Sequence, residues 1–297
     1  MTKVSGFTFI KNGLTLGYPF KESILSISPL CDEVVINVGF EDRECTKDDG
    51  TYEYLRESLK DTETTKYIFL KSWWDPEKTK SGLILSEQTN IALEKISGDV
   101  GIYIQGDEAI HENDFDEIKT AIQRLLKHPS ADAVLFNYHH FFGSVDIEKV
   151  TKKTYRNELR LIRNGRGIKS WLDAQGFRHE DDSKLKCIKS SAEIYHYGWA
   201  RSEQLMDKKT KEFSKLYHGK DFKAQDFSYE RVWGLRKFHG THPKVMNSWI
   251  EENRNAIDIL SLPVKLKLSD SRIILSDFIE YLTGHRFGEY KNYIIVD

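Results

Sequence analysis

The segment Val100–Glu108, VGIYIQGDE, gives the first indication of the fold, because a short apolar strand pattern runs into a glycine and two carboxylates. It stands between two helix patterns. Apolar or small side chains recur every three or four residues over 85–96 before it and over 115–125 after it. A helix, a buried strand and a second helix in succession indicate one strand of a mainly parallel sheet that helices cover.

The same alternation extends outward from this segment over the first 140 residues. We expect strands at 4–10, 33–38, 66–70, 100–105 and 133–138, with helices between Pro19 and Pro29 and at 51–59, 85–96 and 115–125. The second half is less regular, with strand patterns at 158–162, 192–197 and 293–296, a polar and partly helical stretch at 201–223, and a helix pattern at 273–282. The fold class predicted is therefore α/β, a mixed and mainly parallel sheet flanked by helices, with an irregular C-terminal elaboration.

Composition narrows the classes of function. The 297 residues carry 44 Lys and Arg against 46 Asp and Glu, and this balance argues against a nucleic-acid partner. The three cysteines are far apart without a C-x-x-C pair, which argues against a zinc knuckle or a disulfide scaffold. No apolar stretch approaches the roughly 18 residues of a transmembrane segment and no targeting segment is visible, so we expect a cytoplasmic protein.

Candidate chemistry lies just beyond the strand ends, where ligands bind in open parallel sheets. The most informative end is Gln105–Glu108, because two carboxylates there can hold Mg²⁺ or Mn²⁺, and such a cation can carry phosphates. The alternative is a solvated turn that caps the helix starting near Asp114. A P-loop, a G-x-G-x-x-G after the first strand and a G-x-S-x-G elbow are all absent, which argues against P-loop enzymes, dehydrogenases and α/β-hydrolases.

Several motifs in order resemble one enzyme family. The chain is similar to the family 2 glycosyltransferases of the GT-A fold in the segments 4–12, 32–39, Gln88-Thr89-Asn90, YIQGDE at 103–108, DAQGFR at 173–178, YHYGW at 195–199 and TGHRFGEY at 283–290. The resemblance implies a single GT-A-like domain over 1–297, with a nucleotide-binding half at 1–140 and an acceptor half with the C-terminal elaboration at 141–297. It implies a nucleotide-sugar donor, a glycan or other hydroxyl acceptor, and a divalent cation on the diphosphate. It leaves the oligomeric state open.

The acidic motif departs from the family pattern. Asp-x-Asp is usual in the family, whereas Gln105-Gly106-Asp107 has an amide in place of the first carboxylate. Asp107 is then the implied metal ligand, with His196 as the second, since imidazole nitrogen suits Mn²⁺. For His196 the alternative is a core histidine that bonds a backbone carbonyl.

The resemblance also implies a general base that takes the acceptor proton during transfer with inversion. Asp173 is the first candidate and Glu180 the second. Asp173 could instead form an ion pair with Arg160, Arg163 or Arg178, and Glu180 could belong to a solvated turn.

Donor contacts are implied for the ends of the first strands and for one helix face. Glu41 could instead lie in a surface loop, polar residues on an exposed helix are commonly inert, and the lysines of 201–223 suggest a solvated face. The tryptophans could stack on sugar rings or belong to the core. The implied donor-binding residues are Phe9, Ile10, Gly39, Glu41, Gln88, Asn90, Gln105, Gly106 and Asp107.

Two other functions stay open at this point. A sugar-phosphate nucleotidyltransferase uses a related sheet, but it would normally show a Gly-rich basic loop after the first strand, where this chain has Lys11-Asn12-Gly13. A nucleotide- or glycan-binding protein without turnover is the other alternative, and the amide at Gln105 favours it.

Overall fold

A computed structural model describes residues 2–78, 82–218, 222–255, 257–266, 268–284, 286 and 291–296. Most of the C-terminal motif at 283–290, namely positions 285 and 287–290, lies outside them. The strands are β1 (Val4–Ile10), β2 (Glu33–Phe40), β3 (Lys66–Trp73), β4 (Val100–Tyr103), β5 (Glu108–Ile110), β6 (Ala133–Phe142), β7 (Ser144–Lys149), β8 (Asn157–Arg163), β9 (Ile168–Trp171), β10 (Gly176–His179), β11 (Leu185–Trp199), β12 (Leu235–Lys237) and β13 (Tyr293–Ile295). The helices are α1 (Gly13–Leu16), α2 (Phe20–Ile27), α3 (Thr51–Ser58), α4 (Leu83–Leu93), α5 (Phe115–Lys127), α6 (Glu203–His218), α7 (Asn247–Asn253) and α8 (Ser271–Thr283), with 3-10 turns η1 (Ser28–Leu30), η2 (Glu112–Asp114), η3 (Lys244–Met246) and η4 (Leu268–Asp270).

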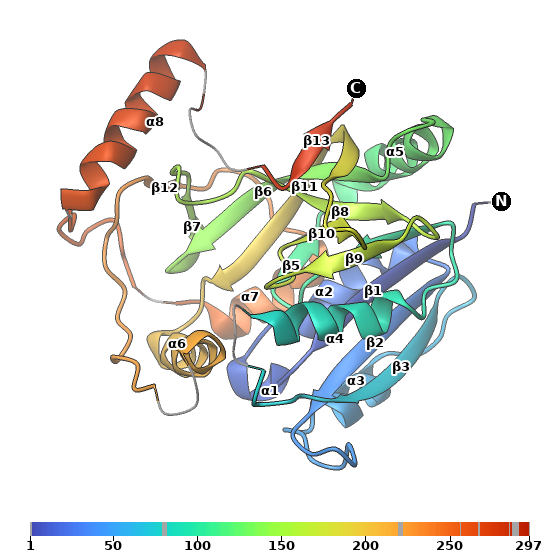
Figure 1. Ribbon diagram of the computed structural model, residues 1–297. Coiled ribbons are helices and arrows are strands. Elements are labelled where there is room, and N and C mark those ends of the chain that lie inside the picture. The colour runs from blue at the N-terminus through green and yellow to red at the C-terminus, as the bar shows by residue number, and fades with distance from the viewer. Residues whose placement is uncertain are drawn as a thin grey trace.

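One large mixed sheet dominates the described structure (Figure 1). Its main path runs β12-β7-β6-β8-β4-β1-β2-β3. The half built from β3, β2, β1 and β4 is parallel, whereas β8 runs antiparallel to both β4 and β6. The long strand β11 pairs in parallel with β6 and in antiparallel fashion with β5. The predicted fold class, a mixed and mainly parallel sheet flanked by helices, is confirmed.

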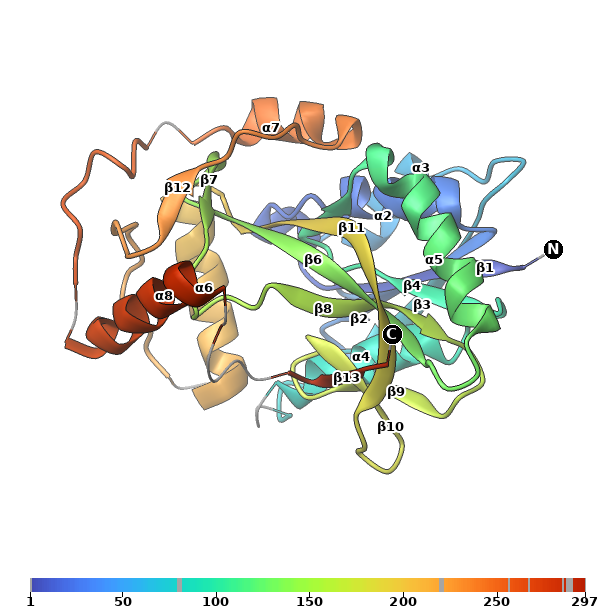
Figure 2. The ribbon, with the colours of Figure 1, turned by 90° about the horizontal axis from the view of Figure 1, so that it is seen from above.

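Helices cover both faces of the parallel half (Figure 2). Phe7 and Val35 point to one face, where they pack with Ala92 and Leu93 of α4. Neighbouring strand residues such as Ile36 point to the other face, where the core includes residues of α2, α3 and α5. Alternating burial on two faces explains why these strands are apolar throughout.

The strand order creates a crevice at the edge of the sheet. The chain passes from β1 to β2 and β3 on one side, and then returns to place β4 on the other side of β1. Such a reversal beside β1 is a topological switch point, and ligands bind there, beyond the carboxyl ends of the strands. The fold therefore points to the residues that follow β1, β2, β3 and β4.

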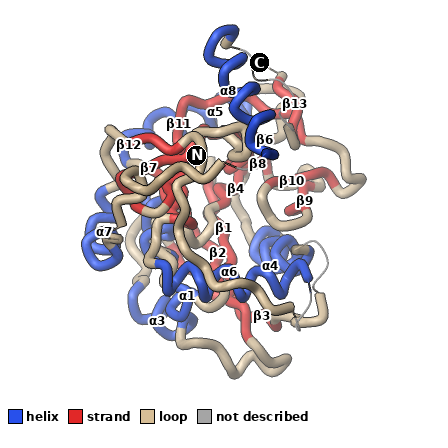
Figure 3. Tube along the Cα trace, turned by 90° about the vertical axis from the view of Figure 1, so that its left-hand side faces the viewer, coloured by secondary structure: helices blue, strands red, loops and turns tan. Residues whose placement is uncertain are grey.

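The irregular part begins after β6. Helix α6 follows β11, and beyond it much of the chain is loop, with α7 and α8 lying apart from each other (Figure 3). The strand pieces expected at 192–197 belong to a single strand, β11, which is 15 residues long. Among the residues described, no helix has both the length and the apolar character of a membrane-spanning segment.

Candidate active site

A cavity of about 530 Å³ opens where the four parallel strands end. Its lining includes Phe9 and Ile10 at the end of β1, Glu41 after β2, Trp74 after β3, and Asp107 after β4. All four strand ends thus contribute to one cavity, as expected for a switch-point site. The turn between β9 and β10 and helix α6 also contribute to the lining, with Asp173, Gln175, Lys209, Glu212, Phe213, Lys215 and Tyr217.

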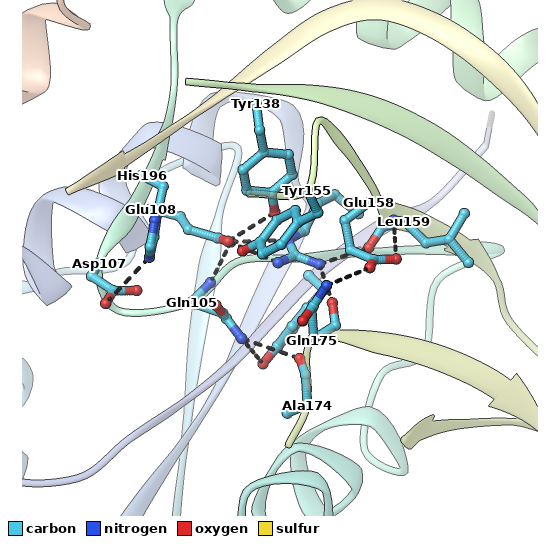
Figure 4. Close-up of polar contacts among 12 residues, drawn as sticks. Gln105, Asp107, Glu108, Tyr138, Tyr155, Glu158, Leu159, Ala174, Gln175 and His196 are labelled. Atoms are coloured by element: carbon cyan, nitrogen blue, oxygen red, sulfur yellow. Dashed lines mark hydrogen bonds and ion pairs between the residues drawn. The ribbon is translucent and has the colours of Figure 1, made fainter. Parts of the chain in front are cut away.

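Asp107, His196 and Lys209 meet in this cavity. The Asp107 Oδ2 atom lies 3.7 Å from His196 Nε2 and 3.2 Å from Lys209 Nζ. The backbone fixes this meeting, because the Tyr197 N–H donates to the carbonyl of Asp107 over 2.7 Å. Figure 4 shows the side chains of Asp107 and His196 directed toward each other. A Cβ at Gly198 would lie 2.6 Å from both Asp107 Oδ2 and His196 Nε2, so a side chain there has no room.

The charges of these groups depend on each other. Burial alone would raise the pKa of Asp107, but the Lys209 ammonium and the His196 imidazole hold it well below its usual range. Burial lowers the pKa of Lys209 to about 8, although Asp107 opposes that shift. Asp107 is therefore an ionised carboxylate in the folded protein, and Lys209 is its closest cation.

A contact with His140 orients the ring of His196. The ring atoms His140 Nδ1 and His196 Nδ1 are 3.1 Å apart, and His140 Nε2 lies 2.7 Å from the carbonyl of Tyr155. Burial and the neighbouring His196 lower the pKa of His140 to about 3, so its ring is neutral. A neutral His140 that donates from Nε2 to that carbonyl must accept at Nδ1, so His196 donates from its own Nδ1. The Nε2 of His196 then faces Asp107.

Glu108 does not belong to the cavity. It is fully buried and receives two bonds from Arg160, of 2.9 Å from Nε and 2.7 Å from Nη2. The Tyr138 hydroxyl donates to the same carboxylate over 2.8 Å and the Gln105 N–H over 3.1 Å (Figure 4). The second acidic residue of the motif thus anchors the turn that presents Asp107.

Gln105 joins this turn to the turn between β9 and β10. Its Nε2 donates to the carbonyl of Ala174 over 3.1 Å (Figure 4). Ala174 and Leu172 both have positive φ values, of 59° and 49°, so they hold Asp173 between two left-handed residues. The amide in place of the usual first carboxylate therefore positions the turn that carries Asp173.

Asp173 lines the cavity and makes no ion pair among the described residues. The ion-pair alternative is wrong, because each candidate arginine is engaged elsewhere. Arg160 binds Glu108, Arg163 donates to the carbonyls of α5, and Arg178 donates to Asn292. Burial raises the pKa of Asp173 above its usual value, which makes the carboxylate a stronger base.

Phe9 and Trp74 form an aromatic stack in the cavity wall, with ring centroids 6.2 Å apart and planes inclined by 28°. Gly39 lies against this wall, since a Cβ there would be 3.2 Å from Lys11 Cδ and 3.4 Å from Trp74. Glu41 reaches the rim, where it lies 3.5 Å from the Lys11 ammonium. The structure therefore brings these predicted donor residues to the cavity or directly beside it, together with Ile10 and Gly106.

Three predicted residues lie elsewhere. Gln88 is buried and ties α4 to the sheet, since its Oε1 accepts from Asn37 Nδ2 and Ser72 Oγ. Asn90 accepts at Oδ1 from a backbone N–H of β9 over 2.7 Å. Glu180 is exposed on the turn after β10, away from the cavity lining. The rotation of α4 turns both amides toward the sheet and β9, so neither lines the cavity, and their donor contacts stay a prediction.

Lys209 is the main residue that the sequence reasoning missed. The lysines of 201–223 suggested a solvated face, yet Lys209 is 7% exposed. Its ammonium lies 5.4 Å from the ring centroids of Tyr18 and Phe213 and 5.7 Å from that of Trp199. The one available signal was the spacing of Lys209, Phe213 and Tyr217, which places all three on one face of a helix.

The donor set does not fit the divalent cation that the family resemblance implies. Asp107 and His196 would supply only two protein ligands, so a cation there would depend on phosphate oxygens and water for the rest of its coordination. The described part of the chain holds no group of three or more His, Cys, Asp and Glu side chains placed for a metal ion. The position next to Asp107 is taken by the Lys209 ammonium, which would have to leave before a cation could bind.

Comparisons with known proteins give structural likeness alone. No family model matches the sequence, and no curated protein matches it. Similar solved structures include TarS of S. aureus in complex with UDP-GlcNAc (TM-score 0.35, 16% identity, 54% of this chain and 45% of that chain). A second is a mannosyltransferase of Pyrobaculum calidifontis in complex with GDP-Man and Mn²⁺ (TM-score 0.34, 15% identity, 55% of this chain and 44% of that chain). A third is glucosyl-3-phosphoglycerate synthase of Mycobacterium tuberculosis in complex with Mg²⁺ and UDP (TM-score 0.29, 17% identity, 46% of this chain and 44% of that chain). In these three alignments the chain spans less than half the length of the matched chain.

Proposed function

We propose that this protein is a glycosyltransferase that moves a sugar from a nucleotide-diphosphate sugar to an acceptor hydroxyl. The observation that carries the proposal is the switch-point cavity, which combines the Phe9–Trp74 stack with the buried Asp107, His196 and Lys209. A planar nucleobase suits an aromatic wall, and a diphosphate suits a polar and partly cationic wall. The order of the sequence motifs supports the same function.

Asp173 is the proposed general base. Its carboxylate takes the proton of the acceptor hydroxyl while the hydroxyl oxygen forms a bond to the anomeric carbon. The bond from that carbon to the donor diphosphate breaks, and the nucleoside diphosphate leaves with the bonding electrons. A single displacement of this kind inverts the anomeric carbon. The raised pKa of Asp173 and its freedom from ion pairs among the described residues support this role.

Nucleotide binding is the first test of the proposal. Thermal unfolding is measured with UDP, GDP, CDP and dTDP, each with Mn²⁺ and with EDTA. A ligand at 100 times its Kd stabilises the folded state by about 2.7 kcal/mol, which corresponds to a rise in Tm of about 4 °C for a chain of this size. We expect such a rise for one or two of the nucleotides. A folded protein whose Tm responds to none of them would refute the proposal.

Turnover is the second test, and it separates an enzyme from a binding protein. With the nucleotide identified, release of nucleoside diphosphate from the matching sugar donors is measured for the wild type, Asp173→Asn and Glu180→Gln. We expect Asp173→Asn to lower kcat by at least 100-fold while nucleotide binding stays within about threefold. Glu180→Gln is the matched control and should act like the wild type. Binding without any turnover would favour the nucleotide-binding alternative.

A further inference from the structure

The charge of a bound diphosphate must be balanced inside the cavity, and Lys209 is placed to do so. Its ammonium donates to the carbonyl of Gly198 over 2.9 Å and to Asp107 Oδ2 over 3.2 Å. An ammonium has three N–H donors, so these two contacts leave one for an anionic oxygen. The surrounding rings of Tyr18, Trp199 and Phe213 stabilise a cation at this position by facing it with their π systems.

A second cation lies behind Lys209. Arg201 is fully buried, and its guanidinium donates to the carbonyls of Leu16 and Gly198. It forms no ion pair with any carboxylate of the described residues, and its Nε has no hydrogen-bond partner there. The Gly198 carbonyl therefore accepts from both Arg201 and Lys209. A buried guanidinium without a contacting carboxylate is costly, and the cost falls when an anion binds nearby.

In the immediate surroundings of Asp107, the charge balance thus favours an anion over a further cation. Asp107 is the carboxylate in contact with Lys209, and its surroundings hold Lys209, His196 and Arg201. Asp107 taken with Lys209 and Arg201 sums to one positive charge. A divalent cation would add two more positive charges beside these buried groups, which Coulomb repulsion opposes. A diphosphate would instead meet the net positive charge of Asp107, Lys209 and Arg201.

We propose that the Lys209 ammonium, supported by the buried Arg201, takes the place of a divalent cation at the diphosphate of the donor, so that nucleotide binding needs no metal. The inference rests on the proposed function, because it assumes that the cavity binds a nucleoside diphosphate. It also explains the amide at Gln105, since a site without a metal has no need of the first carboxylate of the family motif.

A consequence for one variant follows from the same geometry. Lys209→Met keeps most of the length of the side chain, being one heavy atom shorter, and removes its charge. Asp107 and the Nε2 of His196 would then face the cavity without an ammonium group beside Asp107. The variant is therefore expected to bind nucleotide poorly in EDTA and to recover binding when Mn²⁺ is added.

The test is isothermal titration calorimetry with UDP and GDP, in EDTA and in Mn²⁺, on the wild type, Lys209→Met and Lys209→Arg. Lys208→Met is the matched control, because Lys208 is exposed on the same helix and does not line this cavity. In the wild type we expect the Kd in EDTA to lie within threefold of that in Mn²⁺. A lost charge-assisted hydrogen bond should weaken binding to Lys209→Met by about 10- to 100-fold in EDTA. Lys209→Arg and Lys208→Met should stay within about threefold.

The outcomes distinguish a failure of metal-free nucleotide binding from a failure of the proposed glycosyltransferase function. Wild-type binding that disappears in EDTA and returns with Mn²⁺ overturns the inference and leaves the proposed function standing. Wild-type affinity in Lys209→Met, with EDTA present, overturns it as well. Failure of the wild type to bind either nucleotide in any buffer refutes both. The wild-type measurement alone decides the question if Lys209→Met does not fold.

Discussion

Replacing Arg160 by methionine removes the buried cation that binds Glu108, the residue that anchors the turn of Gln105–Asp107. The guanidinium is fully buried and gives two charge-assisted bonds to Glu108, one bond of 2.9 Å to the carbonyl of Leu159 and one of 2.8 Å to that of Gln175. Breaking a buried pair from one side costs about 3–5 kcal/mol, because the remaining charge stays buried without its partner. Glu108 would keep its bonds from Tyr138 and from a backbone N–H, so we place the cost near 4 kcal/mol.

The assay is a double-mutant cycle with Arg160→Met, Glu108→Gln and the double variant, followed by thermal unfolding. With an unfolding entropy of about 2.1 cal/mol/K per residue, a loss of 4 kcal/mol lowers Tm by about 6 °C in a chain of 297 residues. The double variant should cost clearly less than the sum of the two single variants, since neither buried charge is left alone. Lys119→Met removes the exposed pair with Asp116 and should change Tm by less than about 2 °C.

Two results would refute this reasoning about the buried pair. Either single variant could change Tm as little as Lys119→Met does, or the double variant could equal the sum of the two singles. Both would mean that Arg160 and Glu108 contribute independently. A link to function is also expected, because Glu108 anchors the acidic turn. In Arg160→Met the nucleotide-dependent rise in Tm should shrink, even after the lower starting Tm is taken into account.

Burial raises the pKa of Glu158 from 4.5 to about 7, so the folded state binds a proton more tightly than the unfolded state and this residue's contribution to stability falls as pH rises from about 4.5 to 7. Urea unfolding should therefore show Glu158→Gln gaining about 2–3 kcal/mol over the wild type between pH 5 and pH 8, whereas a constant difference would contradict the assignment. Gly198→Ala places a Cβ 2.6 Å from Asp107 Oδ2 and His196 Nε2, so calorimetry should show nucleotide binding weakened at least 10-fold. Gly165→Ala, whose Cβ would meet nothing within 4 Å but whose φ is +72°, should cost stability and leave binding unchanged. Equal effects of the two variants on binding would argue against a site at Gly198.

Local patterns were enough to predict most of the first half of the fold, although the short elements α1 and β5 were not predicted. Strands β1, β2 and β4 begin at the predicted residues, and α2 lies between the two prolines as expected. These elements have clear apolar periodicity because the sheet buries them on both faces. The strand-end rule then led to Asp107 without any knowledge of the packing.

Residues fixed by tertiary packing could not be predicted in the same way. The spacing of α4 defines its apolar face, but the roles of Gln88 and Asn90 depend on how that helix is rotated against the sheet and β9. Lys209 lies in a sequence of mixed charges that resembles a solvated helix. It is buried because Tyr18, nearly 200 positions earlier, and Trp199 lie over it. Glu108 and Asp107 are neighbours in the motif, and the pairing of β5 with β11 sends them in different directions.

Strand β11 makes the site sensitive to chain length rather than to composition. A bulge lies between Lys189 and Glu193, where β11 advances by four residues while its partner β6 advances by two. Beyond the bulge, His196 pairs with Glu108 of β5. Successive side chains of a strand point to opposite faces, so a register slip of one residue would bring Tyr195 or Tyr197 to the place of His196. A single-residue insertion or deletion in this bulge would therefore exchange an imidazole for a phenol beside Asp107. We expect homologous chains to vary more freely in the residue types of this segment than in its length, that is, in the number of residues of β11 between Lys189 and His196.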